Sequence, residues 1–248
     1  MDLHVHADPA TLGQAAGAQA ADLLVDLLAQ RDQVRLVLAT GASQFATLAT
    51  LVGRRDLDWS RVEVFHLDEY LGLPETHPAS FRRYLRERVI DHLPGVTFHG
   101  VRGDAADPLA ECCRLGDLIS TRPVDLMLLG IGENAHLAFN DPPADVTTTM
   151  PYLIVPLDEA CRRQQLGEGW FPSLDAVPTQ AISMSVRQML TARVLIASVP
   201  DTRKAEAVRA ALEGPVTPMV PASYLRSHPR CHLHLDVASA SRLHRVPA

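Results

Sequence analysis

Two consecutive stretches decide the fold: the apolar run Val124-Asp125-Leu126-Met127-Leu128-Leu129 and the loop Gly130-Ile131-Gly132-Glu133-Asn134-Ala135-His136-Leu137-Ala138-Phe139-Asn140-Asp141-Pro142. The apolar run predicts a buried strand of a parallel sheet. A glycine-rich turn directly after such a strand places its loop at the carboxyl edge of the sheet, where open α/β folds bind ligands. The loop holds an imidazole at His136, a carboxylate at Asp141 and a carboxamide at Asn134, which are groups suited to proton transfer. The alternative interpretation is a tight turn with one solvated histidine.

The composition indicates a protein with a substantial core and no basic face. The chain has 248 residues, of which 47% are hydrophobic, and its net charge is −6 with a pI near 6.0. A chain of this length suits one large α/β domain. The acidic balance argues against nucleic acid or an anionic membrane as the main partner. An anionic substrate would need local cations.

The cysteines and the N-terminus indicate a reducing cytoplasm. The four cysteines lack CxxC spacing, and two of them are adjacent in a helical pattern: Cys112, Cys113, Cys161 and Cys231. This arrangement suggests neither a disulfide framework nor a zinc knuckle. The first eight residues have no basic region before an apolar stretch, and no other run reaches membrane-spanning length. We therefore expect a cytoplasmic protein that is not exported.

A candidate anion site precedes the central loop. Arg35–Ala39 reads as a short buried strand, and Gln44–Val52 reads as a helix. Between them lie the small residues Thr40, Gly41, Ala42 and Ser43. Free backbone N–H groups at the start of a helix suit a phosphate. The alternative is a plain turn, because the stretch lacks the Walker lysine and the three-glycine fingerprint.

A pair of acids follows a second predicted strand. Val62–Leu67 is apolar, and Asp68 and Glu69 begin what we expect to be another carboxyl-edge loop, running to Pro74. Adjacent acids where an apolar strand emerges are costly unless they are paired or solvated, which favours a functional role. The alternative is that Asp68 caps a turn.

The remaining segments complete a single α/β domain over residues 1–248, with a mostly parallel, Rossmann-like sheet and helices on both faces. Helices are expected at 11–30, 80–92, 108–121, 202–212 and 222–227, and further strands at 97–98, 181–186, 193–199 and 232–236. Leu157–Val177 is expected to be irregular, as a lid, an active-site wall or an oligomer contact. Arg203 and Lys204 fall in the first turn of a predicted helix, where a bound anion would offset their conflict with the helix dipole.

Several of these stretches recur in one order in a known group of enzymes. They are Thr40-Gly41-Ala42-Ser43, Leu67-Asp68-Glu69-Tyr70-Leu71-Gly72-Leu73-Pro74, His77-Pro78-Ala79-Ser80-Phe81, the central loop, Ala181-Ile182-Ser183-Met184, Arg203-Lys204-Ala205-Glu206-Ala207 and Glu213-Gly214-Pro215-Val216. Together they resemble the glucosamine-6-phosphate deaminase/isomerase and 6-phosphogluconolactonase superfamily.

Two motifs favour the deaminase branch of that superfamily. The lactonases typically follow the loop histidine with Ala-Ser-Leu-Phe-Pro and their Asp-Glu pair with Arg. This chain has His136-Leu137-Ala138-Phe139-Asn140-Asp141-Pro142 and Asp68-Glu69-Tyr70 instead. It therefore looks like a deaminase, which converts glucosamine 6-phosphate or a close relative into fructose 6-phosphate and ammonia.

The resemblance implies a role for each candidate residue. It assigns ring opening to His136 and proton abstraction at C2 of the sugar to Asp68. Both assignments suit the chemistry, since imidazole exchanges a proton near neutral pH and a carboxylate can act as a base without a metal. It assigns the phosphate to Thr40–Ser43 and Lys204, and it groups Glu69 with the substrate-binding residues.

Four departures from the deaminase pattern concern rate and substrate more than fold. Asn134 and Ala135 stand where an aspartate and a glycine usually precede the histidine, and Asp141 replaces a glutamate. We expect the amide of Asn134 to hold the imidazole tautomer, with Asp141 as the orienting carboxylate and Glu133 as its substitute. Gln180 replaces a frequent basic residue. The missing phosphate contact would then come from one of three arginines: Arg162, Arg163 or Arg187.

Two other functions compete with the deaminase. One is a sugar-phosphate lactonase on the same fold, and the other is a non-catalytic sugar-phosphate sensor. The presence of Asp68, His136 and Asp141 together weighs against the sensor, which needs a phosphate-binding site but no catalytic base. No cofactor and no metal are predicted, because the alternating histidines near both ends lack partners in a ligand pattern. The same interior pattern suits a monomer and a homo-oligomer, so both stay open.

Overall fold

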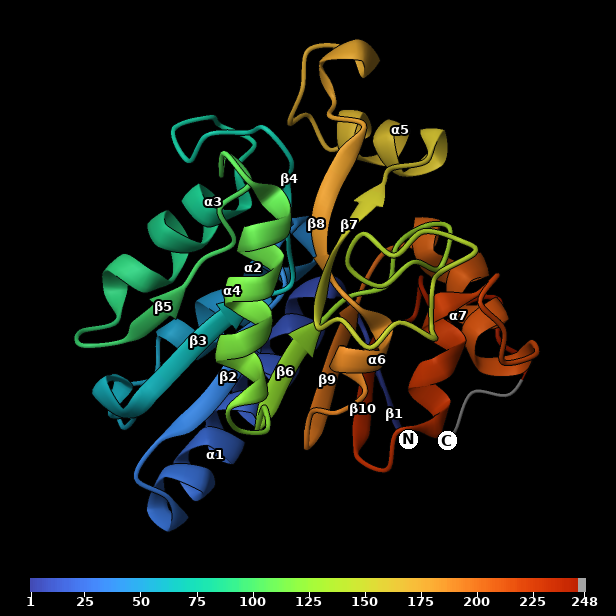
Figure 1. Ribbon diagram of the computed structural model, residues 1–248. Coiled ribbons are helices and arrows are strands. Elements are labelled where there is room, and N and C mark those ends of the chain that lie inside the picture. The colour runs from blue at the N-terminus through green and yellow to red at the C-terminus, as the bar shows by residue number, and fades with distance from the viewer. Residues whose placement is uncertain (245–248) are drawn as a thin grey trace.

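Seven parallel strands form the main sheet of the computed structural model, which describes residues 1–244 (Figure 1). Their order across the sheet is β1-β10-β9-β6-β2-β3-β5. The strands are β1 (Asp2–His6), β2 (Val34–Leu38), β3 (Val62–His66), β5 (Thr97–His99), β6 (Leu126–Leu129), β9 (Val194–Val199) and β10 (Cys231–Asp236). The predicted α/β fold with a mostly parallel sheet is confirmed.

Helices cover both faces of this sheet, as predicted. They are α1 (Pro9–Gln30), α2 (Phe45–Val52), α3 (Phe81–Arg88), α4 (Pro108–Ser120), α5 (Glu159–Gly167), α6 (Val186–Met189) and α7 (Ala205–Glu213). One core cluster joins α1, α2 and α3 to alternate sheet residues such as Leu36 and Leu128. A second joins α4, α6 and α7 to the intervening residues, such as Val37 and Met127. Both faces of each central strand are therefore buried, which explains their unbroken apolar sequences.

Capping residues fix where several helices begin. The carboxylate of Asp8 accepts the backbone N–H of Thr11 before α1, and Asp107 accepts two backbone N–H groups at the start of α4. Ser80 caps α3 in the same way. Such caps satisfy backbone donors that a helix start leaves unpaired. Within residues 1–244, no helix is both long and apolar enough to cross a membrane.

The chain reverses its direction of travel across the sheet between β2 and β6. It runs from β2 outward to β3 and β5, and then returns to β6 on the other side of β2. Leu36 pairs with Leu126 and Val37 with Met127 across this junction. The loops after β2 and β6 therefore diverge above neighbouring strands, which opens a crevice at the carboxyl edge.

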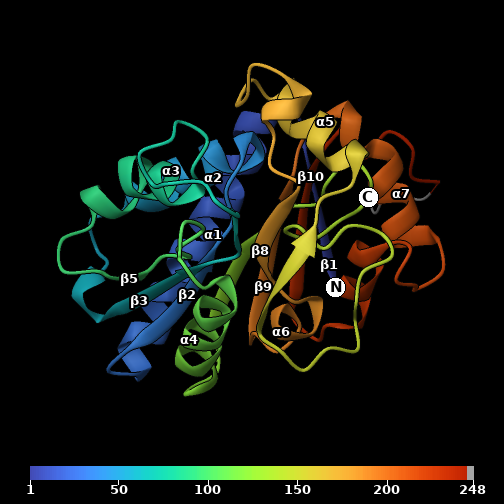
Figure 2. The same cartoon turned by 45° about the horizontal axis from the view of Figure 1, so that its top comes forward.

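A small antiparallel sheet stands above that edge. Its strands are β4 (Asp68–Tyr70), β8 (Gln180–Met184) and β7 (Tyr152–Pro156), in that order. Figure 1 and Figure 2 show β7 and β8 rising from the main sheet toward α5, which lies at the top of the first view. An aromatic cluster fills the space beneath, with Tyr70, Phe81, Phe139 and Phe171 buried together.

Two expectations about this region need correction, and one strand was missed. The segment from Asp68 was predicted as a loop, but its first three residues pair with β8 because Ser183, Ile182 and Ala181 lie opposite them. The strand β7 was not predicted. Leu157–Val177 is not irregular, since it contains α5, whose helix begins at the cap Asp158 and buries Cys161 and Gln165.

The predicted helix 202–212 begins differently from the expectation. Thr202–Lys204 forms a short 3-10 turn, and α7 itself starts at Ala205. The carboxylate of Asp201 accepts the backbone N–H of Arg203 at the start of that turn. Lys204 and Arg203 therefore precede the regular helix, and the segment 221–227 is likewise a 3-10 helix.

Histidines from both ends of the chain meet on β1 and β10. His4 pairs with His234 in the strand register, and their rings stack at 4.6 Å between centroids. Nε2 of His6 lies 3.0 Å from Nδ1 of His234. Burial and the neighbouring imidazoles lower the pKa of His234 to about 3. The cluster is held by ring stacking and hydrogen bonds along the sheet edge.

The close packing of α1 on α2 needs glycine at position 17. A methyl group on Gly17 would lie 2.5 Å from the backbone oxygen of Thr47 and 2.6 Å from Cβ of Thr50. Both distances are below the contact distance of real side chains, and one partner is backbone. Since α2 follows the loop Thr40–Ser43, this contact also helps to position that loop.

We predict that Gly17→Ala destabilises the protein by about 1–3 kcal/mol through overpacking. The gain in helix propensity, about 1 kcal/mol, is too small to compensate for the displacement of α2. Urea unfolding monitored by circular dichroism measures the change. Gln14→Ala, at an exposed position of the same helix, is the control. A Gly17→Ala variant at least as stable as the parent would contradict the packing argument.

Candidate active site

A cavity of about 270 Å³ opens at the carboxyl edge of the main sheet. Its wall includes seven residues that the sequence had singled out: Thr40, Gly41, Ala42, Ser43, Asp68, His136 and Lys204. They come from the loop after β2, the start of β4, the loop after β6 and the turn before α7. The structure thus gathers residues from four separate segments around one space, at the switch point of the sheet.

The loop after β2 offers backbone groups to the cavity. Gly41 has φ +99°, a conformation that residues with a side chain rarely adopt. Behind the loop, the buried Gln44 donates from Nε2 to Oγ of Ser43 at 3.1 Å and to the carbonyl of Ser198 at 3.2 Å. These contacts hold Ser43 in place beside the backbone amides, which suits an anion.

Two cations line the cavity together with this loop. Lys204 is 7% exposed, and burial lowers its pKa, although nearby carboxylates oppose the effect. Arg203 is half exposed and lies 3.4 Å from a carboxylate oxygen of Glu133. The two cations and the backbone donors of the loop Thr40–Ser43 give the cavity groups that attract an anion, although the chain as a whole is acidic.

The arginines proposed to replace the missing phosphate contact lie elsewhere. Arg162 donates to the carbonyls of Leu174 and Val177, and Arg163 pairs with Glu159 on the same helix. Arg187 is not among the cavity residues either. The second cation at the cavity is Arg203, which the sequence analysis noted only for its place at a helix start.

Asp68 brings a buried carboxylate to the cavity wall. It is 6% exposed, and its strand is held by pairing with Ser183 on β8. Burial raises the pKa of Asp68 well above its ordinary value, and the neighbouring charge of Glu69 adds to the effect. A carboxylate in such surroundings is a stronger base than one in water.

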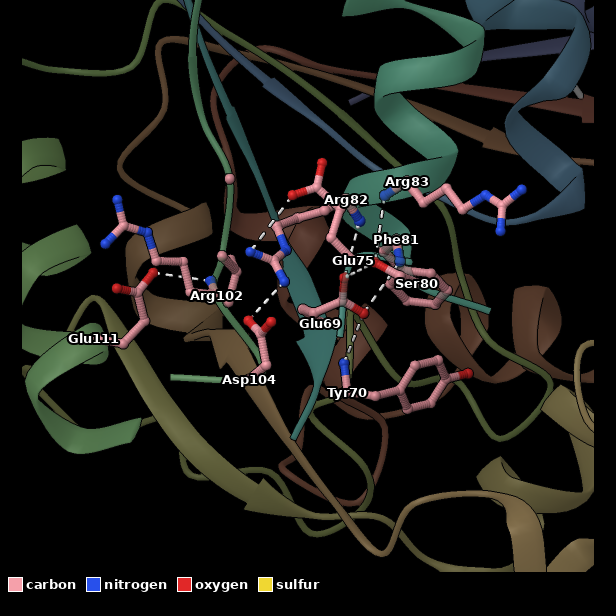
Figure 3. A network of polar contacts seen from close by, with 12 residues as sticks. Glu69, Tyr70, Glu75, Ser80, Phe81, Arg82, Arg83, Arg102, Asp104 and Glu111 are labelled. Carbon is pink, nitrogen blue, oxygen red and sulfur yellow. Dashed lines mark hydrogen bonds and ion pairs between the residues drawn. The ribbon is translucent and has the colours of Figure 1, made fainter. Parts of the chain in front are cut away.

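Glu69 does not line the cavity, which corrects its expected role in substrate binding. Alternation along β4 turns it away from Asp68. Its carboxylate accepts hydrogen bonds from the backbone N–H of Phe81 and Arg82, at 3.1 and 2.9 Å, and from Oγ of Ser80 at 2.7 Å. Figure 3 shows these contacts converging on Glu69. Glu69 thus anchors β4 to the first turn of α3.

The contacts around Glu69 extend to a surrounding ion-pair network (Figure 3). The guanidinium of Arg82 lies 2.7 Å from Asp104 and 3.8 Å from Glu75. Burial raises the pKa of Glu69, while the hydrogen bonds from Arg82 and Ser80 oppose the rise. The network fixes the far side of β4, so that the position of Asp68 is set from behind.

His136 is held by a carboxylate from its own loop. Nδ1 of His136 lies 3.0 Å from Oδ1 of Asp141, and Gly132 packs against the ring so closely that a methyl group there would lie 2.2 Å from Nε2. Burial tends to raise the pKa of Asp141, but hydrogen bonds from His136 and Asn134 outweigh it, and the pKa is lowered. An ionised Asp141 keeps the proton on Nδ1 and leaves Nε2 as the free base.

Asn134 acts on this pair in a different way from the one expected. Its amide does not reach the imidazole. Nδ2 donates to Oδ1 of Asp141 at 3.1 Å, and Oδ1 accepts the backbone N–H of His136 at 3.1 Å. Glu133, the suggested substitute carboxylate, points instead to Arg203. The orienting carboxylate at the ring is therefore Asp141.

The helix α5 supplies a wall that the sequence did not specify. Gln164, Gln165 and Glu168 line the cavity. The hydroxyl of Tyr70 donates to Oε1 of Gln165 at 2.6 Å, and Oε1 of Gln164 accepts the backbone N–H of Glu133 at 3.1 Å. The predicted lid or wall is thus a short helix, tied both to β4 and to the central loop.

One group of possible metal ligands occurs in the described residues, and its atoms bond to one another. His136, Asp141 and Cys161 have ligand atoms within 4.8 Å. The Nδ1 atom of His136 and both oxygens of Asp141 are already used in hydrogen bonds within the protein. We therefore assign these side chains to one another and not to an ion.

Comparison with known proteins now places this cavity in a family. The family model described as glucosamine-6-phosphate isomerases/6-phosphogluconolactonase matches residues 7–233. The chain belongs to this family. The match includes every cavity residue discussed above, and the resemblance noted in the sequence is confirmed.

Relatives within the family indicate the branch. A glucosamine-6-phosphate deaminase of Exiguobacterium sp. is 38% identical over 222 residues, which cover 89% of this chain and 85% of the relative. One from Bacillus thuringiensis is 33% identical over 219 residues, covering 88% and 82%. A solved structure of a monomeric glucosamine-6-phosphate deaminase has a TM-score of 0.89 at 30% identity, covering 98% of this chain and all of that one.

A lactonase structure shares the fold at greater distance. The 6-phosphogluconolactonase from Shewanella baltica has a TM-score of 0.80 at 19% identity, covering 95% of this chain and 97% of that one. At that identity the likeness shows the fold alone. The relatives at higher identity are deaminases, which agrees with the family branch expected from the two central motifs.

We predict that Glu69→Ala lowers the free energy of unfolding by about 3 kcal/mol, because several buried donors lose their acceptor. Ser80→Ala removes one of those donors and one helix cap, so its cost should be about 1 kcal/mol. Urea unfolding of both variants measures the difference. Equal costs for the two substitutions would show that Glu69 is not the anchor of β4.

Proposed function

We propose that this chain is a glucosamine-6-phosphate deaminase of amino-sugar metabolism, which converts glucosamine 6-phosphate and water into fructose 6-phosphate and ammonia. The observation that carries the proposal is the meeting of two kinds of group in one cavity. Lys204 and the loop Thr40–Ser43, which suit an anion, line it together with Asp68 and His136, which suit proton transfer. A sugar with a phosphate at C6 and reacting atoms at C1 and C2 needs both kinds of group in one site.

The anion-binding groups of the cavity would bind the phosphate and orient the sugar. Backbone N–H groups and the hydroxyls of Thr40 and Ser43 would donate to the phosphate oxygens, and Lys204 would neutralise part of their charge. Fixing C6 in this way directs C1 and C2 toward the carboxylate and the imidazole. Positioning of this kind reduces the entropy lost on reaching the transition state.

His136 is proposed to open the sugar ring. Its Nε2, free because Asp141 holds the proton on Nδ1, accepts the proton of the C1 hydroxyl. The C1–O5 bond breaks, and the imidazolium returns the proton to O5. The result is the open-chain aldehyde with the amine still on C2. Asp141 stabilises the imidazolium while it exists.

Asp68 is proposed to move the proton between C2 and C1. Its carboxylate removes the C2 proton, the electron pair forms the C1–C2 double bond, and the carbonyl oxygen O1 takes a proton from the protonated amine on C2, which gives an enolamine. Asp68 then returns its proton to C1. The product is a protonated imine at C2, which water hydrolyses to the ketone with release of ammonia as ammonium. The buried surroundings of Asp68 raise its pKa and so strengthen it as a base.

The first experiment measures ammonia and fructose 6-phosphate released from glucosamine 6-phosphate by the purified protein, with hydrolysis of 6-phosphogluconolactone measured alongside. Equal amounts of ammonia and ketose support the deaminase. Lactone hydrolysis without amino-sugar turnover would assign the chain to the lactonase function. Binding of the sugar phosphate without either reaction would indicate a sensor.

The proposal extends to the setting of the enzyme. A small amino-sugar phosphate would be its partner, in the cytoplasm, and catalysis would proceed without a cofactor. Acid–base groups on the chain supply every proton transfer above, which supports this assignment. Residues 1–248 would form one catalytic domain.

We predict that Asp68→Asn lowers kcat by at least about 10²-fold, because the amide keeps the shape of the side chain and removes the base. Folding and binding of glucosamine 6-phosphate should be nearly unchanged. Steady-state kinetics and isothermal titration calorimetry measure the two effects. Full activity of Asp68→Asn would rule out this residue as the base.

We predict that Lys204→Ala acts mainly on KM, which should rise through loss of phosphate binding while kcat changes little. Arg203→Ala should raise KM less, because this side chain is half exposed and its charge is screened by water. Kinetics with glucosamine 6-phosphate measure both variants. A large fall in kcat at constant KM would contradict the phosphate assignment for Lys204.

A further inference from the structure

Asp158 links the helix α5 to the central loop from behind the cavity. Its Oδ1 accepts the backbone N–H of Cys161 at 2.6 Å and so caps the start of α5. Its own backbone N–H donates to Oδ2 of Asp141 at 3.1 Å. Its Oδ2 lies 3.4 Å from Nδ2 of Asn134. One residue thus contacts both the helix and the side chains that hold His136.

These contacts complete the surroundings of Asp141. Oδ1 of Asp141 accepts from Nδ1 of His136 and from Nδ2 of Asn134, and Oδ2 accepts from the backbone of Asp158. Donors from two distant segments therefore fix both oxygens. A carboxylate held in this way has one orientation toward the imidazole, and an orientation set from outside the loop does not depend on the loop alone.

The side chain of Asn134 separates the carboxylates of Asp141 and Asp158. Its amide nitrogen faces Asp141 and Asp158, while its oxygen accepts the backbone N–H of His136. An aspartate at position 134 would bring three carboxylates into contact. The deaminase pattern usually has an aspartate at this position. An amide at position 134 is therefore consistent with the carboxylate that Asp158 on α5 already supplies there.

The titratable groups around Asp141 come from several elements. His136 belongs to its own loop, and Asp158 and Cys161 belong to α5. Burial raises the pKa of the Cys161 thiol, and the charges of Asp141, Asp158 and Asp68 add to the rise. Asp68 thus approaches from β4. The cations of the cavity, Arg203 and Lys204, belong to the turn before α7.

We propose that Asp158 is a positioning residue for the deaminase reaction. By capping α5, Asp158 fixes the position of its own backbone N–H. Its carboxylate also contacts the side-chain amide of Asn134 and fixes that group. These two donors, the Asp158 N–H and the Asn134 amide, hold Asp141 against His136. Asp158 does not touch the reacting atoms. The inference rests on the proposed function, because the reaction gives His136 its task.

The proposal predicts which kinetic constant changes. Loss of the cap frees the first turn of α5, so Asp141 loses a donor and becomes easier to protonate. A protonated Asp141 no longer keeps the proton on Nδ1 of His136 as a carboxylate would. Removal of the Asp158 charge by itself would lower the pKa of Asp141, but Asp141 also loses donors that stabilise its charged form. We expect the loss of donors to dominate, so the pKa of Asp141 rises and the acid limb of the kcat profile moves to higher pH. Phosphate binding stays intact, so KM changes little.

The test compares Asp158→Ala, Asp158→Asn and Asp107→Ala, with the full pH profile of kcat and KM for each. Asp158→Ala should lower kcat about tenfold to hundredfold and move its acid limb upward. Asp158→Asn keeps a cap of equal quality and should recover most of that loss. Asp107→Ala removes an equivalent aspartate cap on α4, a helix with no residue in the cavity wall, and should leave kcat and its profile unchanged.

A merely structural role would give a different pattern. If Asp158→Ala and Asp107→Ala have the same kcat and the same pH profile, the proposal is overturned. It is also overturned if Asp158→Asn recovers nothing. Thermal unfolding of all three variants checks that the caps on α5 and α4 are lost to comparable extents.

A second measurement does not require turnover. Carbon-13 NMR of labelled aspartate side chains follows the titration of Asp141 directly. Asp158→Ala and, independently, Asn134→Asp should both move this titration to higher pH, and adding Asp158→Asn to Asn134→Asp should reverse part of the shift. Unchanged titration in both single variants contradicts the proposal. If the parent shows this coupling but no deaminase activity, the proposed function fails and the coupling stands.

Discussion

The parallel pairing of β2 with β6 is the constraint on which the site depends. These strands are distant in the chain, yet their pairing through Leu36 and Leu126 sets two loops side by side at one edge of the sheet. One loop carries backbone donors and the other carries an imidazole. The crevice between them follows from the order of the strands, because the chain leaves β2 and β6 in opposite directions.

Electrostatic contrast among the groups at the cavity then gives them different tasks. Cations and amides near Ser43 favour an anion, while burial at Asp68 raises the pKa of a carboxylate. Asp141 shows the opposite effect, since hydrogen bonds from His136 outweigh its burial and its pKa is lowered. Two carboxylates close to one cavity are thereby given different proton affinities, which is how one site can hold both a base and an orienting anion.

Local pattern was enough to predict the central sheet and most of the cavity wall. Thr40, Asp68 and the loop that carries His136 each come after an apolar strand, so a parallel sheet must bring them to the same edge. Local pattern failed for α5, which is a short polar helix with few apolar residues to reveal its period. Glu69 was misplaced because adjacent strand residues face opposite ways. The contact of Asn134 with Asp158 joins residues 24 positions apart, and only the folded chain reveals it.

The small antiparallel sheet has a consequence for how this architecture can diversify. The strands β7 and β8 and the helix α5 form a continuous insert between β6 and β9, and Gln164 and Gln165 of α5 line the cavity. Most of the remaining wall comes from loops that follow strands of the main sheet. Substitutions or length changes in the insert can therefore reshape one wall of the cavity while the loops of the main sheet keep their positions.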